Sequence, residues 1–318
     1  MNIQSIDGKI QLLPFIREAI TSILDIRQKS GWEITAFNLP ASWKNSQGEG
    51  VKVAVLDTGC DLNHPDLVDN LLPGFNFVKR GTPPDDDNGH GSHVTGTICA
   101  SNNDIGIVGV APKAKVVPVK VLDENGSGDL DAVAEGIRWS ANQGVDFITM
   151  SLGSSTETPQ LYEAIVYAER KGVVTFCAAG NAGQTRQIFY PAAYPNVIGI
   201  GAIDSNFDRA NFSCTGPDLD FLAPGVKILS TVPTNSYEYL SGTSMSTPFA
   251  VGVACLLLSF TRVNHVDFGL KTAQDYIKIF KQCTIPVSNP QFAKKHFFEG
   301  FGIIDPRKIN EWISSHQN

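Results

Sequence analysis

The chain contains the run Val51-Lys52-Val53-Ala54-Val55-Leu56-Asp57-Thr58-Gly59, in which a short apolar strand ends in a carboxylate and a glycine. Such a nearly continuous apolar run is typical of a strand buried on both faces of a parallel sheet. On its C-terminal side, apolar strands alternate with helical stretches, at Gly91–Ala100, Val116–Val121, Leu130–Asn142, Phe147–Leu152, Gln160–Lys171, Val173–Ala178 and Val197–Ala202. This alternation predicts an α/β fold with a mostly parallel central sheet flanked by helices on both faces.

The two ends of the chain differ from this pattern. The C-terminal part predicts a strand followed by three helices, at Ile228–Val232, Ser244–Thr261, Lys271–Gln282 and Pro306–Ser315. Residues 1–30 show no strand pattern, and their apolar residues fall at roughly helical spacing, at Leu12, Leu13, Ile16, Ile20, Ile23 and Leu24. We therefore expect an amphipathic helical appendage over residues 1–30, called the extension below.

Composition restricts the possible partners and location. The 318 residues carry 25 basic and 32 acidic side chains, a net charge of −7, without a block of Lys or Arg, so we expect neither nucleic acid nor a membrane as a partner. The start Met1–Asp7 lacks the pattern of a secretory signal, which favours a cytoplasmic location. The longest apolar run, Phe249 to Leu258, is too short for a bilayer and predicts a buried helix. The six cysteines are widely spaced, which favours reduced, packed thiols.

Two of the candidate chemical groups lie at the end of a predicted strand and at the start of a predicted helix. Asp57 ends the first strand, although an aspartate there is more often a turn or cap residue that accepts backbone N–H groups. His90 lies in Asn88-Gly89-His90-Gly91-Ser92-His93, where small neighbours leave its imidazole open at a helix start. His90 and His93 could instead bind a metal, but the glutamate and third ligand of the metalloprotease pattern are missing, so a structural role is expected for His93.

Ser244 lies in Leu240-Ser241-Gly242-Thr243-Ser244-Met245-Ser246-Thr247-Pro248, at the start of the apolar helix. We expect Pro248 within the first turn, where proline is tolerated. The unpaired N–H groups and positive dipole end of a helix N-terminus can stabilise a developing oxyanion. By frequency alone, a serine at this position is a helix cap.

These groups together satisfy the requirements of nucleophilic catalysis. A serine hydroxyl needs a base, and the imidazole needs a carboxylate that fixes its tautomer. Ser244, His90 and Asp57 supply these roles, and Asn181 in Ala178-Ala179-Gly180-Asn181-Ala182-Gly183 offers an amide donor for the oxyanion.

The four motifs, in this chain order, resemble the signature blocks of the subtilisin family of serine proteases, over roughly residues 32 to 305. The resemblance implies a single subtilisin-like domain at residues 31–305, between the extension and a C-terminal helical extension at 306–318. It implies that Asp57 orients His90, that His90 is general base and acid, and that Ser244 is the nucleophile. Asn181 and the Ser244 N–H would form the oxyanion hole, to which Thr243 can add a hydroxyl.

The same resemblance predicts the substrate groove. Ser151, Leu152 and Gly153 correspond to the family's strand that pairs with the peptide, and Gly180 and Thr243 also belong to the substrate site. Phe189 precedes Tyr190-Pro191, where family members often carry Gly, Ser or Ala. An inward-pointing Phe189 would fill the P1 pocket and favour Ala over Phe at P1. Alternatively, Phe189 turns away, or the alignment is shifted by one residue.

The stretch Ser101–Gly109 resembles the calcium loop of the family, and oxygen ligands of this kind suit calcium. The implied ligands of a structural Ca²⁺ are the carbonyls of Ser101, Ile105 and Ile107 and the side chains of Asn103 and Asp66, with Gln28 as a further candidate. A metal-free surface loop is the alternative. We interpret Asp85-Asp86-Asp87 as a solvated loop.

Leu12-Leu13-Pro14-Phe15 resembles the Leu-Ile-Pro-Tyr-type inhibitory motif of the intracellular subtilisins, which lies across the active site. Pro14 would kink the segment and hold its backbone away from attack. The alternative is a helix start with Pro14 in its first turn. Intracellular relatives use a C-terminal extension to dimerise, so the resemblance also implies a possible homodimer.

The sequence therefore predicts a calcium-stabilised serine endopeptidase that hydrolyses peptide bonds of intracellular proteins through an acyl-enzyme and is made as an autoinhibited precursor. Two alternatives remain. A catalytically silent subtilisin-fold binding protein is disfavoured by the intact Asp57, His90, Ser244 and Asn181. An acyl hydrolase is disfavoured by the peptide-pairing strand and by the missing Gly-X-Ser-X-Gly turn.

Overall fold

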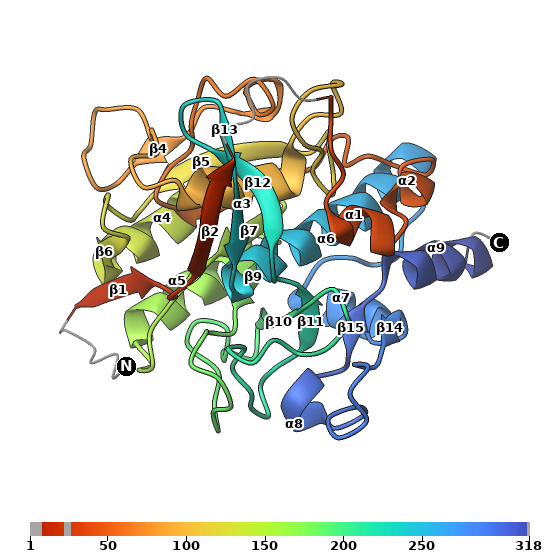
Figure 1. The fold of residues 1–318 in the computed structure, drawn as a ribbon. Helices are drawn as coiled ribbons and strands as arrows, with labels where there is room; N and C mark the ends of the chain where they lie inside the picture. Colours follow the sequence, from red (N-terminus) through yellow and green to blue (C-terminus); the bar gives the residue numbers. More distant parts are fainter. Residues whose placement is uncertain (1–7, 22–26, 317–318) are drawn as a thin grey trace.

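A nine-stranded sheet forms the centre of the computed structural model, which describes residues 8–21 and 27–316 (Figure 1). All its neighbouring strands are parallel except the pair β14–β15. In spatial order the strands are β14 (Thr284–Ile285), β15 (Ile303–Ile304), β11 (Phe221–Pro224), β10 (Val197–Ile203), β9 (Val174–Ala178), β7 (Phe147–Met150), β3 (Lys52–Asp57), β5 (Lys115–Lys120) and β4 (Phe75–Asn76). The predicted α/β fold with a mostly parallel sheet is confirmed.

Helices cover both faces of this sheet. On one face α3 (His90–Cys99) packs against α6 (Thr243–Asn264), and on the other α4 (Leu130–Asn142) packs against α5 (Pro159–Arg170) (Figure 1). The shorter helices are α1 (Trp32–Ala36), α2 (Leu39–Ser42), the 3-10 helix η1 (Val68–Asn70), α7 (Ala273–Phe280), α8 (His296–Glu299) and α9 (Pro306–Ser315).

The prediction of a helical extension is wrong. Its described part forms two strands, β1 (Lys9–Leu12) and β2 (Ile16–Thr21), joined through Pro14. Strand β1 lies between β6 (Ser127–Asp129) and β8 (Leu152–Gly153), and β2 pairs with β13 (Ser236–Ser241), which pairs with β12 (Ile228–Val232). The backbone of the extension forms its hydrogen bonds with the edges of strands that lie far along the chain. The spacing of apolar residues within the extension cannot reveal these distant partners. Ile23 and Leu24 lie outside the described residues.

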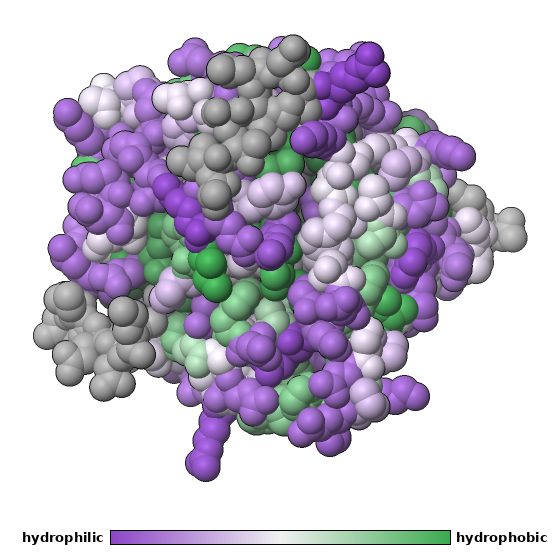
Figure 2. All heavy atoms as spheres, viewed as in Figure 1, coloured by the Kyte–Doolittle hydropathy of each residue, from purple (hydrophilic) through white to green (hydrophobic). Residues whose placement is uncertain are grey.

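The extension adds little to the interior. Of the buried apolar residues in the described ranges, only Ile10 and Leu13 belong to it. The buried core is therefore formed almost entirely by residues outside the extension. Figure 2 shows a largely polar face in the view of Figure 1, with apolar side chains gathered near its middle.

The apolar helix α6 is a core helix. Among the described helices it alone is long and apolar enough to cross a membrane, and 94% of its apolar window is buried inside the protein. Pro248 lies inside α6 beyond the first turn, so the prediction of a first-turn proline is wrong. All six cysteines are free and buried, as expected. Burial raises the pKa of Cys99 and of Cys283 to about 12.

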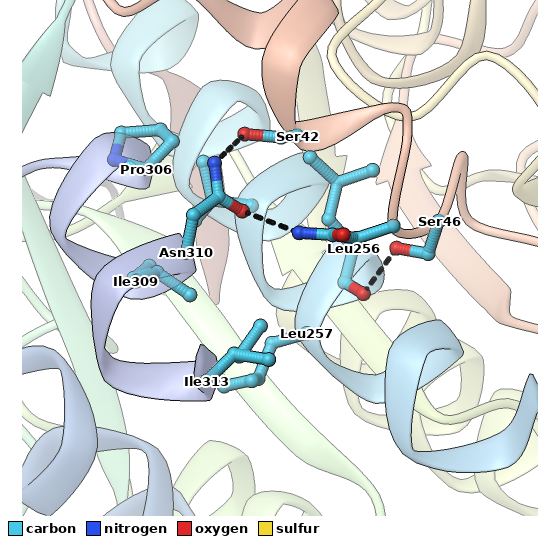
Figure 3. Close-up of a pocket in the computed structure, with 10 residues that line it drawn as sticks. Ser42, Ser46, Leu256, Leu257, Pro306, Ile309, Asn310 and Ile313 are labelled. Carbon is cyan, nitrogen blue, oxygen red and sulfur yellow. Dashed lines mark hydrogen bonds between the residues drawn. The ribbon is translucent and has the colours of Figure 1, made fainter. Parts of the chain in front are cut away.

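The C-terminal helix α9 packs on the domain of its own chain. Ile309 and Ile313 are buried, and Asn310 Nδ2 donates to Ser42 Oγ at 2.8 Å (Figure 3). The apolar side of α9 faces α6 through Leu256 and Leu257. Pro306 follows the cap Asp305, whose carboxylate accepts from the Arg307 N–H, so the helix begins and ends where the sequence predicts.

Candidate active site

The carboxylate of Asp57 and the imidazole of His90 form a buried pair. Asp57 is the last residue of β3 and His90 the first of α3, and His90 Nδ1 lies 2.8 Å from Asp57 Oδ1. Both residues are fully buried. The Thr58 N–H also donates to Asp57 Oδ1 at 2.8 Å, so the expected turn role and the pairing with His90 coexist. The carboxylate is thus placed to fix the tautomer of His90.

Glycine permits this close approach of helix to strand. A Cβ built on Gly91 would lie 2.1 Å from the carbonyl oxygen of Gly59, a contact that no side chain tolerates. The cap residue Gly89 has φ 104°, in the left-handed region. The first turn of α3 therefore sits directly on the loop after β3, which brings His90 to Asp57.

Ser244 lies in the first turn of α6 and is fully buried. Its hydroxyl donates to the Ser151 carbonyl at 3.4 Å, and its own carbonyl accepts from Ser151 Oγ at 3.1 Å. Pro248 has no N–H to donate to the Ser244 carbonyl, which leaves this carbonyl free for Ser151. His90 Nε2, the nitrogen turned away from Asp57, is buried without a hydrogen-bond partner among the described residues.

Asn181 presents its amide N–H₂ to a peptide carbonyl. Its Oδ1 accepts from the N–H and from Oγ1 of Thr243, each at 2.9 Å, and its Nδ2 donates to the Pro14 carbonyl at 2.7 Å. Thr243 therefore orients Asn181, which differs from the expected direct contribution of its hydroxyl to the oxyanion site. Thr243 Oγ1 also accepts from the Gly180 N–H at 3.2 Å.

The extension occupies the groove that the sequence predicts for substrate. In β1, Gln11 pairs with Gly153 and Leu12 with Leu152, and the Leu12 N–H donates to the Gly126 carbonyl at 2.8 Å. The chain then passes the Asp57–His90 pair, where the Phe15 ring lies 4.9 Å from the His90 ring. The expected alternative, Pro14 in the first turn of a helix, does not hold.

Leu13 and Phe189 share the pocket beside Gly153 and Gly180. Leu13 is 1% exposed, and a Cβ built on Gly153 would lie 3.1 Å from Leu13 Cδ2 and 3.3 Å from Phe189 Cβ. A Cβ built on Gly180 would lie 2.7 Å from Phe189 Cδ2. The Phe189 side chain therefore lies between both walls of the pocket, in contact with Gly180.

Among the predicted calcium ligands, Ser101, Asn103 and Ile107 are hydrogen-bonded to Asp66, whereas Ile105 is exposed. Its Oδ2 accepts from the Ile107 N–H and from Tyr237 Oη, each at 2.9 Å, and its Oδ1 accepts from Asn103 Nδ2 at 3.1 Å. Gln28 reaches the carbonyls of Ser101 and Ile107 at 2.7 and 3.1 Å. In the described ranges no group of three His, Cys, Asp or Glu could hold a metal. A carbonyl-rich set with one carboxylate fits calcium in its donor chemistry.

Asp85 and Asp87 are exposed, as expected for a solvated loop, but Asp86 differs from this expectation. Asp86 is buried; burial alone would raise its pKa, but hydrogen bonds from Gly89, Ser92 and Thr58 outweigh this and lower it. Lys120, which the sequence analysis missed, is 3% exposed and donates to the Thr58 carbonyl and to Asp87 Oδ1, each at 2.6 Å. These contacts hold the loop after β3 in place.

His93 has a structural environment. Its Nε2 lies 3.0 Å from the Ile228 carbonyl and 3.1 Å from the Glu238 carbonyl. Burial, together with the charge of nearby His90, lowers the pKa of His93 to about 3. His93 therefore stays neutral at physiological pH and joins α3 to strands β12 and β13.

The sequence is similar to those of known proteins of one family. Residues 48–280 match the sequence profile of the subtilase family. The chain belongs to the subtilase family. It is a subtilisin-type serine protease, a hydrolase with one α/β domain.

Two relatives of this subtilase are named for an intracellular location. It is 44% identical over 266 residues to the "Intracellular serine protease" of Paenibacillus polymyxa, covering 80% of each chain. It is 41% identical over 264 residues to the "Major intracellular serine protease" of Bacillus subtilis, covering 80% of this chain and 82% of the relative. It is also 46% identical over 240 residues to "Thermitase" of Thermoactinomyces vulgaris, covering 75% and 86%.

Proposed function

We propose that this subtilase is an endopeptidase that hydrolyses peptide bonds of intracellular proteins through an acyl-enzyme. Ser244 Oγ attacks the scissile carbonyl carbon while His90 Nε2 takes its proton, and Asp57 stabilises the imidazolium that forms. The proton then passes from His90 to the leaving amine. Water enters, His90 again acts as base, and the acyl-enzyme bond to Ser244 is hydrolysed.

One contact carries the proposal. Asn181 Nδ2 donates to the carbonyl of Pro14 at 2.7 Å, beside the buried Asp57–His90 pair and the N-terminus of α6. A donor already aimed at a peptide carbonyl is the arrangement needed to stabilise a tetrahedral oxyanion, together with the Ser244 N–H. In subtilisins, loss of this amide donor costs about 10²–10³-fold in kcat, a value that we adopt rather than derive.

Casein hydrolysis tests the proposal. A chain without residues 1–21 retains Gln28 and all of the buried core except Ile10 and Leu13. We expect it to degrade casein, whereas the same chain with Ser244→Ala should not. If neither the shortened chain nor its Ser244→Ala variant degrades casein or is labelled by a fluorophosphonate, a silent binding protein would be favoured. Ester hydrolysis without casein hydrolysis would favour an acyl hydrolase.

The extension acts as an autoinhibitory segment of a zymogen in this proposal. In a bound substrate, one residue fills the P1 pocket and gives its own carbonyl to the oxyanion site. Here Leu13 lies beside Gly153, but the carbonyl held by Asn181 belongs to the next residue, Pro14. This offset by one residue prevents either neighbouring bond from taking the substrate position, so the segment blocks the groove without being cut.

Phe189 sets the P1 preference in this proposal. Its contact with Gly180 reduces the depth of the pocket, so small P1 side chains such as Ala are preferred over Phe. The buried Leu13 marks the size of side chain that the pocket holds in this structure.

Calcium stabilises the loop around Asp66 in this proposal. Asp66, Asn103 and Gln28, with the carbonyls of Ser101, Ile105 and Ile107, would hold the ion. The ion would supply structural stabilisation, whereas the amide N–H₂ groups of Gln28 and Asn103 donate to these oxygen atoms in the structure.

The names of the intracellular relatives favour a cytoplasmic location with intracellular proteins or peptides as substrates. Nucleic acid and membranes are not partners in this proposal, because the charge of −7 disfavours binding to anionic surfaces. A homodimer remains part of the proposal, with the exposed side of α9 as its candidate contact, because the apolar side of this helix is buried within the chain.

A further inference from the structure

The leaving-group side of the groove contains a buried acid, Glu238. It lies on β13, is 2% exposed, and its Oε2 is 3.4 Å from Nε of Arg17. Within the described ranges Arg17 is the only cation within 4.0 Å of this carboxylate, and Glu238 Oε1 is buried without a hydrogen-bond partner. A buried carboxylate is costly unless a cation is paired with it.

Arg17 reaches Glu238 because the extension continues the groove as a strand. Strand β2 pairs antiparallel with β13, with Leu240 opposite Arg17 and Ser241 opposite Ile16, and the two strands run side by side (Figure 1). Glu238 is thus diagonal to Arg17 across the pair, within reach of a long side chain. Any peptide that enters as an added strand on β13 meets the same acid.

The Arg17 side chain is 47% exposed and lies at the edge of a hollow beside Glu238. Arg17 lines this hollow of about 250 Å³ together with Asn88, Gly89, Val232, Pro233, Ser236 and Glu238. Its Nη2 donates to the Asn88 carbonyl at 3.3 Å, in addition to the ion pair. The hollow contains two other acids, which have partners within the domain. Asp87 is paired with Lys120, and Asp86 accepts hydrogen bonds from Gly89 and Ser92. Glu238 therefore depends on the bound segment for a cationic partner.

We propose that Glu238 determines specificity on the leaving-group side, by selecting peptides with arginine at the third residue beyond the scissile bond. The position is counted from the carbonyl held by Asn181, which belongs to Pro14, and Arg17 is the third residue after it. The offset of Leu13 concerns the residues before this carbonyl, whereas Arg17 lies after it, on the strand that pairs with β13. This inference rests on the proposed peptidase function and names its substrate class. In the full chain the extension fills the subsite with its own arginine.

Peptide cleavage by the chain without residues 1–21 tests the proposal. Two peptides differ only in Arg or Gln at the third residue beyond the cleaved bond. We expect the Arg peptide to have about tenfold higher kcat/KM, and Glu238→Gln to abolish this difference. Glu124→Gln, which removes an exposed acid outside the hollow, should preserve it. An equal preference for Arg with Glu238→Gln, or no preference in the parent chain, would overturn the proposal while leaving the peptidase function intact.

The full chain provides a second test. Arg17→Gln and Glu238→Gln should each raise basal peptide hydrolysis about tenfold, and the exchange of both charges, Arg17→Glu with Glu238→Arg, should restore the low rate. Glu18→Gln is the matched control, because Glu18 forms only an exposed pair with Lys227 at 3.5 Å. No restoration by the exchange would contradict a direct pairing. Absence of any hydrolysis by the shortened parent chain would instead refute the peptidase function itself.

Discussion

At the scale of single residues, Thr243 illustrates how a site residue can be identified while its role is misjudged. The motif places it beside Ser244, and its hydroxyl was expected at the oxyanion. It instead binds Asn181 Oδ1 through both its N–H and its hydroxyl. The oxygen and the nitrogen of the Asn181 amide lie on different sides of the same planar group. Because Thr243 holds the oxygen, the Nδ2 is turned toward the incoming carbonyl. Thr243 is therefore a positioning residue.

Phe189 provides a prediction at this scale. Replacing it with alanine removes the ring that lies against Gly180, so we expect the ratio of kcat/KM for Phe-P1 over Ala-P1 peptides to rise by about tenfold or more. Matched peptides and the chain without residues 1–21 are suitable for the measurement. The variant Val263→Ala is a control, because this side chain is exposed and lies at the opposite end of α6 from Ser244. A parent enzyme that already prefers Phe at P1 would contradict the proposed role of Phe189.

At the scale of elements, the local sequence pattern is sufficient to predict an element that forms its backbone hydrogen bonds within itself. The sequence predicts α4 and α9 with the bounds that the structure has, because helix hydrogen bonds, caps and one apolar face are all local. Asp57, His90 and Ser244 could also be found, since each ends a strand or lies at the start of a helix. The strands of the extension could not, because β1 and β2 depend on edges supplied by β6, β8 and β13, more than a hundred residues away.

The loop of Ser101–Gly109 provides a prediction at this scale. Removal of calcium by a chelator should lower Tm by about 5–10 °C, and Asp66→Asn should remove most of this response. Asp104→Asn is the matched control: Asp104 lies in the same loop but outside the ligand set, and asparagine tolerates its φ of 69°. Calorimetry in the Ser244→Ala background avoids self-digestion. Identical Tm with and without calcium would refute the calcium site.

At the scale of the whole molecule, buried carboxylates couple stability to pH. Burial raises the pKa of Glu33 from 4.5 to about 7, and this residue is 4% exposed. Because the folded-state pKa is higher than the unfolded-state value, this group's contribution to the free energy of unfolding is largest below pH 4.5 and is lost as pH rises through about 7.

Glu33→Gln should therefore flatten the pH dependence of stability and raise the free energy of unfolding at pH 8 by up to about 3 kcal/mol. Urea unfolding at pH 5 and pH 8, in the Ser244→Ala background, is the measurement. Glu163→Gln, at a side chain that is 72% exposed, should change neither value. Some pH dependence should remain from Asp220, whose pKa burial also raises to about 7. A Glu33→Gln chain with unchanged pH dependence would disprove the assignment.

The whole molecule combines a catalytic centre with a segment of the same chain that covers it. The rate of labelling by a fluorophosphonate, compared between the full chain and the chain without residues 1–21, examines both features together. We expect the shortened chain to be labelled at least about tenfold faster, and Ser244→Ala to prevent labelling in both. Labelling that persists with Ser244→Ala would show that Ser244 is not the nucleophile. Equal labelling rates for the two chains would show that the extension does not block the site.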